Sequence, residues 1–229
     1  MMHLKQSFIF LLLTYCLLSC SSDNKNQGQI EEDNKLLNLD TVSSFYSEGS
    51  EGVDSSRIYF QNAIDMLREI SFFLTTENDT IVYLEAVNLM EKAIVLDVKN
   101  LNTYNNLSRL YFKLGRFNEA IRTLDRLLLV DSNYVQAITA QGFIYEKIGD
   151  MQTAIGKYDY VLSYYNQNIV NDFSIEINRL FLMLLLGEIE NVSLELERIK
   201  RKYPKQNLDF FELQFENFDR KKFIDNSLR

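Results

Sequence analysis

The amino-acid sequence predicts an all-α protein in which about four helix-turn-helix units stack as an α-solenoid. Three residues return 34 positions later along the chain: Tyr111, Gly115 and Ala120 recur as Tyr145, Gly149 and Ala154. The apolar residues around them recur every three or four positions, which is the period of a helix face. A repeat of this length is typical of arrays of small helical units. Such arrays present an open binding surface rather than an enclosed catalytic pocket.

The repeat at residues 101–134 is predicted to form a helix, a tight turn, a second helix and a turn. One face of the first helix carries Tyr104, Leu107, Tyr111 and Leu114. Gly115 follows, where the end of a helix often needs a left-handed backbone. The second helix has an apolar stripe made of Ala120, Ile121, Leu124, Leu127 and Leu128. Residues 131–133 are turn formers, and they end the repeat.

The repeat at residues 135–168 follows the same plan. Ile138, Gly142 and Tyr145 belong to its first helix, Gly149 to its turn, and Ala154, Tyr158 and Val161 to its second helix. We expect Ala120 and Ala154 to lie where paired helices cross closely. A larger side chain at either position would overpack the crossing, at a cost of about 1–3 kcal/mol.

These positions resemble the signature of the tetratricopeptide repeat family. The matching residues are Tyr104, Leu107, Tyr111, Gly115 and Ala120, then Gly142, Tyr145, Gly149, Ala154 and Tyr158. Ser108 stands where the family has glycine, and Ser132 and Asn166 stand where it has proline. The resemblance covers residues 55–205. It implies a right-handed α-solenoid in which the first helix of each unit lines a concave groove that binds a protein or peptide partner.

One degenerate repeat lies on each side of the two regular ones. Residues 81–96 are predicted to form a second helix, residues 60–74 its displaced first helix, and residues 75–80 a long loop between them. After a short insertion that follows residue 168, the family spacing returns at Gly187, Val192, Leu196, Ile199 and Pro204. Residues 180–186 are densely apolar but too few to cross a bilayer, so we expect a buried inner helix there.

The N-terminus predicts export and lipid attachment. Residues 8–18 are apolar, too few to span a membrane, and fit the core of a secretory signal. The sequence Leu17-Leu18-Ser19-Cys20 resembles the lipobox of bacterial lipoproteins, which implies a signal peptide at 1–19 and lipidation of Cys20. An ordinary secretory peptide or an uncleaved anchor remains the alternative. Residues 20–54 are acidic and poor in apolar side chains, so we expect a flexible tether.

The sequence after the cysteine bears on location. Ser21 stands where aspartate would favour retention in the inner membrane of some bacteria. We therefore expect the lipid anchor to sit in the outer membrane, with either the periplasmic or the surface face possible.

Composition argues against most catalytic and metal-dependent classes. The formal net charge is −8, and no basic patch precedes the C-terminal tail, so nucleic-acid binding is not expected. The only histidine is His3, and the two cysteines are Cys16 and Cys20. The mature chain therefore lacks the residues for a Ser-His-Asp or Cys-His nucleophile or a His/Cys zinc site. Carboxylate pairs remain, namely Glu188 with Glu190 and Asp209 with Glu212. We expect no enzyme activity, no cofactor and no metal.

The candidate groove consists of residues that lie between the stripe positions of two first helices. These residues are Asn102, Asn105, Arg109, Phe112 and Lys113, then Gln136, Thr139, Phe143, Glu146 and Lys147. Their amides suit a peptide backbone, the arginine suits a carboxylate, and the two aromatic rings could anchor a partner. Phe112 and Phe143 could instead pack between neighbouring units.

Residues 206–229 are predicted to form a C-terminal helix and tail, with the helix over 207–223. This helix either caps the solenoid or docks a partner or a membrane face. Together, these features predict a non-catalytic adaptor, tethered by lipid in the envelope of a Gram-negative bacterium, that holds a protein or peptide partner in its groove. The alternative is an accessory lipoprotein that captures glycans for an outer-membrane uptake system, although the chain has no tryptophan.

Overall fold

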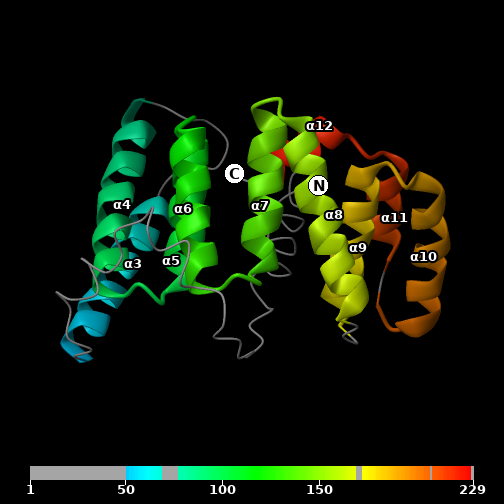
Figure 1. The fold of residues 1–229 in the computed structure, drawn as a ribbon, viewed down its shortest axis with the longest axis horizontal. Coiled ribbons are helices and arrows are strands. Elements are labelled where there is room, and N and C mark those ends of the chain that lie inside the picture. Colours follow the sequence, from blue (N-terminus) through cyan, green and yellow to red (C-terminus); the bar gives the residue numbers. More distant parts are fainter. Residues whose placement is uncertain (1–49, 69–76, 169–171, 207, 228–229) are drawn as a thin grey trace. The chain divides into compact units, whose positions relative to one another are not determined.

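A computed structural model describes residues 50–68, 77–168, 172–206 and 208–227, and all regular structure in these ranges is helical (Figure 1). The helices are α3 (Ser50–Arg68), α4 (Glu77–Leu96), α5 (Leu101–Lys113), α6 (Phe117–Val130), α7 (Val135–Lys147), α8 (Met151–Gln167), α9 (Phe173–Leu186), α10 (Ile189–Lys202), α11 (Asp209–Glu216) and α12 (Arg220–Ser227). The predicted all-α fold of consecutive helix-turn-helix units is confirmed.

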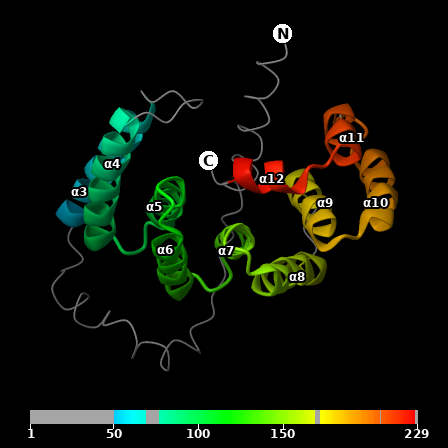
Figure 2. The same cartoon turned by 90° about the horizontal axis from the view of Figure 1, so that it is seen from above.

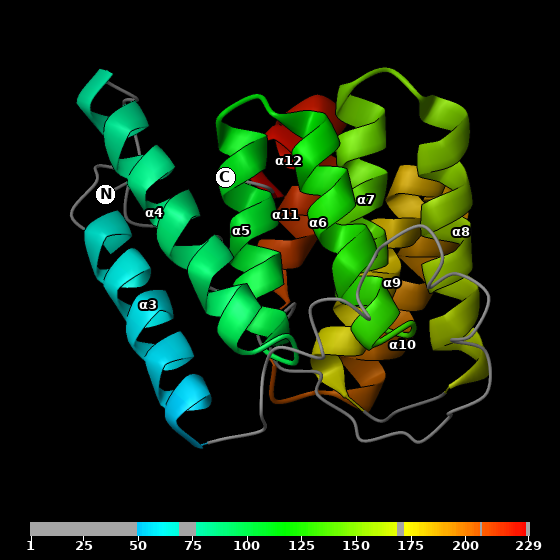
Figure 3. The ribbon, with the colours of Figure 1, turned by 60° about the vertical axis from the view of Figure 1, so that its left-hand side comes forward.

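The described residues divide into two compact bodies, 50–137 and 138–227, with the division inside α7. In the N-terminal body, α3 packs on α4, α4 on α5 and α5 on α6, and Figure 3 shows the first of these pairs side by side. The core residues of these contacts are fully buried: Ala63, Ala86, Met90, Ala93, Leu107, Ala120, Leu124 and Leu127. The Ser56 hydroxyl donates to the Ala93 carbonyl oxygen at 2.9 Å, which fixes α3 against α4.

In the C-terminal body, α8 packs on α9 and α9 packs on α10. The apolar run at residues 180–185 of α9 is buried throughout, as predicted for an inner helix. Val192, Leu196 and Ile199 of α10 are also buried, at the positions that the sequence pattern indicated. None of the described helices is both long and apolar enough to cross a membrane.

One buried ion-pair cluster joins α9 to α10. Glu176 is 4% exposed, and its carboxylate accepts from Arg179 at 2.8 Å, Arg198 at 2.5 Å and Lys202 at 2.8 Å. Burial alone would raise the pKa of Glu176, but the hydrogen bonds from Arg198 and Lys202 outweigh it and lower the pKa below its ordinary value. The carboxylate is therefore held in its charged form.

Three glycines end helices with a left-handed backbone. The φ angles are 71° at Gly115, 91° at Gly149 and 82° at Gly187, each one residue or two after the last helical residue. In each case the next amide donates to the carbonyl five residues before it; for Gly149 this is Asp150 to Tyr145, at 2.8 Å. This pairing satisfies carbonyl groups that the helix end would leave free. The predicted tight turns are thus confirmed, and the same junction recurs at Gly187.

Two helix starts differ from the sequence prediction. α3 begins at Ser50, before the helix predicted over 60–74 and inside the expected tether at 20–54, and α4 begins at Glu77, inside the segment 75–80 that was expected to be a loop. Asp79, in this first turn, carries negative charge, which stabilises the start of a helix. The acidic and polar residues at 77–80, which the sequence pattern assigned to a loop, therefore form the first turn of α4.

The prediction of one helix over 207–223 is wrong, because this segment contains α11 and α12. The side-chain amide of Asn217 donates to the Leu213 carbonyl at 3.0 Å, which closes the end of α11. The Asp219 carboxylate accepts the backbone amide of Lys222 at 2.9 Å, an N-cap that begins α12. These two short polar side chains break the helix between them. Residues 1–49, which include the expected signal peptide, Cys20 and most of the tether, lie outside the described part of the chain.

Candidate protein-binding site

In the C-terminal body, α7 and α8 approach each other closely at Gly142. A Cβ atom added to Gly142 in α7 would lie 2.4 Å from Cε1 of Tyr158 in α8. Tyr158 is fully buried, as is Ala154 one turn before it. Only glycine at position 142 lets the tyrosine ring approach the helix backbone this closely. The ring is therefore fixed against α7, and its hydroxyl reaches the end of that helix.

Glu146 is the charged centre of the site. Its side chain is only 12% exposed. The Tyr158 hydroxyl donates to Glu146 Oε2 at 3.0 Å, while Arg220 of α12 donates from Nε to Oε1 at 2.5 Å and from Nη2 to Oε2 at 2.9 Å. Burial, together with the neighbouring Glu146 carboxylate, raises the pKa of the Tyr158 phenol. The tyrosine thus remains a neutral hydrogen-bond donor, and the carboxylate recognises a guanidinium group in the two-point geometry that is specific for arginine.

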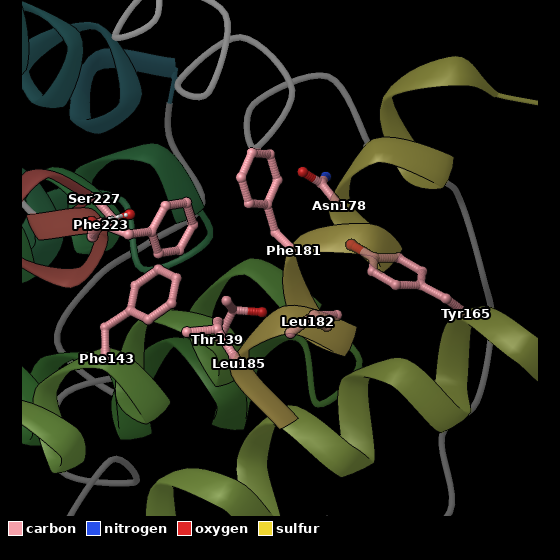
Figure 4. Close-up of a pocket in the computed structure, with 9 residues that line it drawn as sticks. All are labelled: Thr139, Phe143, Tyr165, Asn178, Phe181, Leu182, Leu185, Phe223 and Ser227. Carbon is pink, nitrogen blue, oxygen red and sulfur yellow. Dashed lines mark hydrogen bonds between the residues drawn. The ribbon is translucent and has the colours of Figure 1, made fainter. Parts of the chain in front are cut away.

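An aromatic slot lies next to this ion pair. The Phe223 ring of α12 stacks on Phe181 of α9, with ring centroids 4.9 Å apart, and meets Phe143 of α7 edge-on at 5.8 Å. Figure 4 shows the three rings gathered around one space, with Thr139, Leu182 and Leu185 beside them. Offset and edge-on pairs of this kind each contribute about 0.5–1.5 kcal/mol beyond the burial of apolar area.

A small cavity of about 30 Å³ remains between these side chains. Thr139, Phe143, Tyr165, Asn178, Phe181, Leu182, Leu185, Phe223 and Ser227 line it (Figure 4). Such a volume suits one or two water molecules. With α12 in place, the cavity is therefore too small for an organic ligand.

The four predicted groove residues of α7 in the C-terminal body come together against α12. Phe143 contacts Phe223, Glu146 pairs with Arg220, and Lys147 forms an ion pair with Asp225. Thr139 lines the cavity that Phe223 closes. Figure 2 shows α12 next to α7 and α9. Phe143 is only 4% exposed, so its ring lies under α12 rather than on an open surface.

The other predicted groove residues lie in the N-terminal body. Asn102 is exposed, and Arg109 and Lys113 are half-buried, whereas Asn105, Phe112 and Gln136 are buried. The Phe112 ring packs on Phe117 of α6 with centroids 5.4 Å apart. Lys113 Nζ lies 5.1 Å from the centre of the Tyr83 ring of α4. Of these side chains, Asn102 is thus the one most open to a partner.

A second tyrosine–glutamate pair occupies the N-terminal body. The Tyr111 hydroxyl donates to Glu91 Oε1 at 3.0 Å, and Arg126 Nη1 lies 3.5 Å from Glu91 Oε2. Burial and the nearby carboxylate raise the pKa of Tyr111 to about 12. A tyrosine, a glutamate and an arginine therefore meet in each body.

Sequence reasoning missed the residues that α12 and α9 bring to the site. Arg220, Phe223, Phe181 and Leu185 come from segments that the repeat pattern did not connect to α7. One signal was available, because Arg220 and Phe223 are three residues apart and share one face of a helix. Contact of that face with Glu146 depends on tertiary packing, which no local pattern shows.

The carboxylate pairs singled out in the sequence take part in surface contacts. Glu212 pairs with Lys200, and Glu188 accepts a hydrogen bond from Asn191 at 3.2 Å. Glu190 and Asp209 are exposed. In the described residues, no group of three or more histidine, cysteine, aspartate and glutamate side chains could hold a metal ion.

Comparison with known proteins supports the repeat assignment. Residues 83–142 match the tetratricopeptide repeat family, a stretch that runs from α4 into α7 and includes the whole of α5 and α6. The chain is 26% identical over 122 residues to anaphase-promoting complex subunit 3 of Schizosaccharomyces pombe, covering 53% of this chain and 18% of that protein. It is 32% identical over 77 residues to the uncharacterized protein ycf37 of Pyropia yezoensis, covering 34% and 41%. The chain thus spans less than half the length of either relative.

Several solved helical-repeat structures are also similar. The tetratricopeptide repeat domain of Arabidopsis OM64 matches with a TM-score of 0.42 and 18% identity, over 57% of this chain and 96% of that one. MamA from Desulfovibrio magneticus RS-1 matches with a TM-score of 0.45 and 15% identity, over 76% and 89%. A tetratricopeptide repeat protein from Parabacteroides merdae gives a TM-score of 0.32 and 15% identity, over 76% and 98%.

Proposed function

We propose that this chain is a non-catalytic scaffold that binds a protein or peptide partner through the first helices of its tetratricopeptide-like repeats. The observation that carries the proposal is the family match over residues 83–142, together with the repeated helix-turn-helix units around it. Helical repeat arrays offer extended surfaces for other chains rather than enclosed pockets. The 30 Å³ cavity in the C-terminal body is consistent with this role, because it leaves no room for a substrate.

We further propose that a lipid on Cys20 tethers the scaffold to a bacterial membrane, the outer membrane in a Gram-negative cell. The support comes from the sequence, in which an apolar run and a lipobox-like tetrapeptide precede an acidic, polar segment. Two or more acyl chains would hold the protein stably at the bilayer, whereas one chain would bind it only marginally. Cys20→Ser should move the protein from the membrane pellet to the soluble fraction and abolish the added lipid mass in mass spectrometry. An unchanged fractionation would refute the tether.

Site-specific photo-crosslinking in cells tests the binding role. The cross-linker replaces Asn102 or Lys147, which lie on first helices and are exposed. Matched controls replace Arg122 in α6 and Tyr160 in α8, which are exposed on second helices. We expect one protein to be captured from the first-helix positions and not from the controls. Capture from the controls alone, or from none of the four positions, would contradict binding through the first helices.

A further inference from the structure

We propose that the face of α7 and α9 beneath α12 is a binding site for a helical segment of a partner protein, and that α12 is a resident copy of that segment. The partner segment would carry an arginine and a phenylalanine three residues apart. This inference rests on the proposed protein-binding function and names the chemistry of the partner.

The hydrogen bonds of Arg220 are of the kind that recognises a specific side chain. Its guanidinium donates twice to Glu146 and a third time, from Nη1, to the backbone carbonyl of Leu185 at 2.5 Å. A helix that served only to cover apolar surface would not need these three hydrogen bonds. Lysine could not reproduce it, because a single ammonium group lacks the planar fork that matches both carboxylate oxygens. The site therefore selects arginine at this position.

The apolar contacts share a face of α12 with the arginine. Phe223 fills the slot between Phe143 and Phe181, and Ile224 beside it is buried. These residues are three and four positions after Arg220, so all three lie on one side of the helix. Lys221 and Lys222 are exposed on the other side. An amphipathic helix laid into an aromatic groove is a common mode of peptide recognition.

A second ion pair sets the direction in which the helix lies on the site. Asp225 pairs with Lys147, one residue after Glu146 in α7. The site thus presents a negative group to the start of the bound helix and a positive group to its later part. A peptide with the opposite direction would place like charges together, which disfavours it.

The resident helix is short enough to be exchanged. α12 has eight residues, and the polar break at Asn217 and Asp219 separates it from α11. Isolated helices below about 12–15 residues are marginal in water, so α12 depends on its contacts with α7 and α9. A partner helix that makes the same contacts and adds its own can therefore displace α12.

Peptide binding to the full chain tests this proposal. The probe is a fluorescein-labelled peptide with the sequence of residues 217–227, measured by fluorescence anisotropy. A chain carrying Arg220→Ala and Phe223→Ala has a weakened resident helix but an intact site. We expect it to bind the probe at least about tenfold more tightly than the unmodified chain, in which α12 competes at an effective concentration on the order of millimolar. Lys221→Ala with Lys222→Ala is the matched control and should bind like the unmodified chain.

Two results would overturn the proposal. One is equal probe affinity for the double variant and the unmodified chain. The other is equal binding of a probe in which alanine replaces the arginine and the phenylalanine. If the double variant does not fold, hydrogen exchange of the unmodified chain decides the question. Amides of α12 should then exchange by local opening, faster than those of α9, and equal protection of the two helices would show a fixed cap.

The outcome separates this inference from the general function. If photo-crosslinking from Lys147 captures a partner and probe peptide added before irradiation does not reduce that capture, the chain binds proteins but not through an arginine–phenylalanine helix. If no first-helix position captures a partner, binding through the first helices is itself refuted. Inhibition of the capture by probe added before irradiation supports both.

Discussion

Replacing Gly142 with alanine tests whether the close approach of α8 to α7 holds the C-terminal body together. The added methyl group would lie 2.4 Å from Cε1 and 2.9 Å from Cδ1 of Tyr158, whose ring is fully buried. Overpacking costs about 1–3 kcal/mol. Displacing the ring also weakens the Tyr158–Glu146 hydrogen bond, and a buried group left without its partner costs about 1–3 kcal/mol. The higher helix propensity of alanine offsets about 1 kcal/mol of this loss in stability.

The expected result is a loss of about 3 kcal/mol in the free energy of unfolding, measured by urea denaturation followed by circular dichroism. Gly156→Ala is the matched control, because Gly156 lies within α8 and nothing lies within 4 Å of its added Cβ. This variant should be about 1 kcal/mol more stable than the unmodified protein. If both variants shifted the midpoint in the same direction and by a similar amount, the steric reasoning would be refuted.

Three other substitutions address the turn, the helix crossing and the buried acid. Gly149→Ala should cost about 1–2 kcal/mol, since φ is 91° although its Cβ would meet nothing within 4 Å. Ala154→Leu should cost about 1–3 kcal/mol by overpacking a fully buried site. Glu176→Gln should cost about 3 kcal/mol at neutral pH. The pKa of Glu176 is lowered in the folded protein, so its charged form stabilises the fold above the ordinary glutamate pKa of about 4.3. This stabilisation is lost as the pH falls through the folded-state pKa. The stability difference between Glu176→Gln and the unmodified protein should therefore shrink in acid. Urea denaturation midpoints at neutral pH check Gly149→Ala and Ala154→Leu, and unchanged midpoints would contradict the strain and the overpacking. A pH series checks Glu176→Gln, and a stability difference that persists in acid would contradict the role of the charged carboxylate.

The repeat architecture could be predicted because it depends on local rules. The 34-residue echo located Gly115 and Gly149 at helix ends, and the structure gives both a left-handed backbone. Ala120 and Ala154 are fully buried, as their small size indicated. Helix boundaries were predicted less well where polar residues are equally compatible with a loop and with the first turn of a helix. The acidic residues before Ile81 read as a loop but begin α4.

The candidate site was only partly predictable. The spacing within α7 identified Phe143, Glu146 and Lys147 as members of one surface, and the structure brings all three against α12. Their partners Arg220 and Phe223 lie in a segment whose break into two helices the apolar pattern did not reveal. Contacts between distant segments depend on how whole helices pack, and a single sequence carries no record of that packing.

Glu146 also has a consequence for the order in which the C-terminal body assembles. Its two donors lie at very different separations along the chain, 12 residues for Tyr158 and 74 for Arg220. Contacts between near neighbours in sequence form quickly, whereas closing a long segment is slower and costs more chain entropy. The α7–α8 hairpin can therefore fold first, with Tyr158 already orienting the carboxylate. That hairpin would then hold the arginine-binding position preformed and open until α12 packs against it.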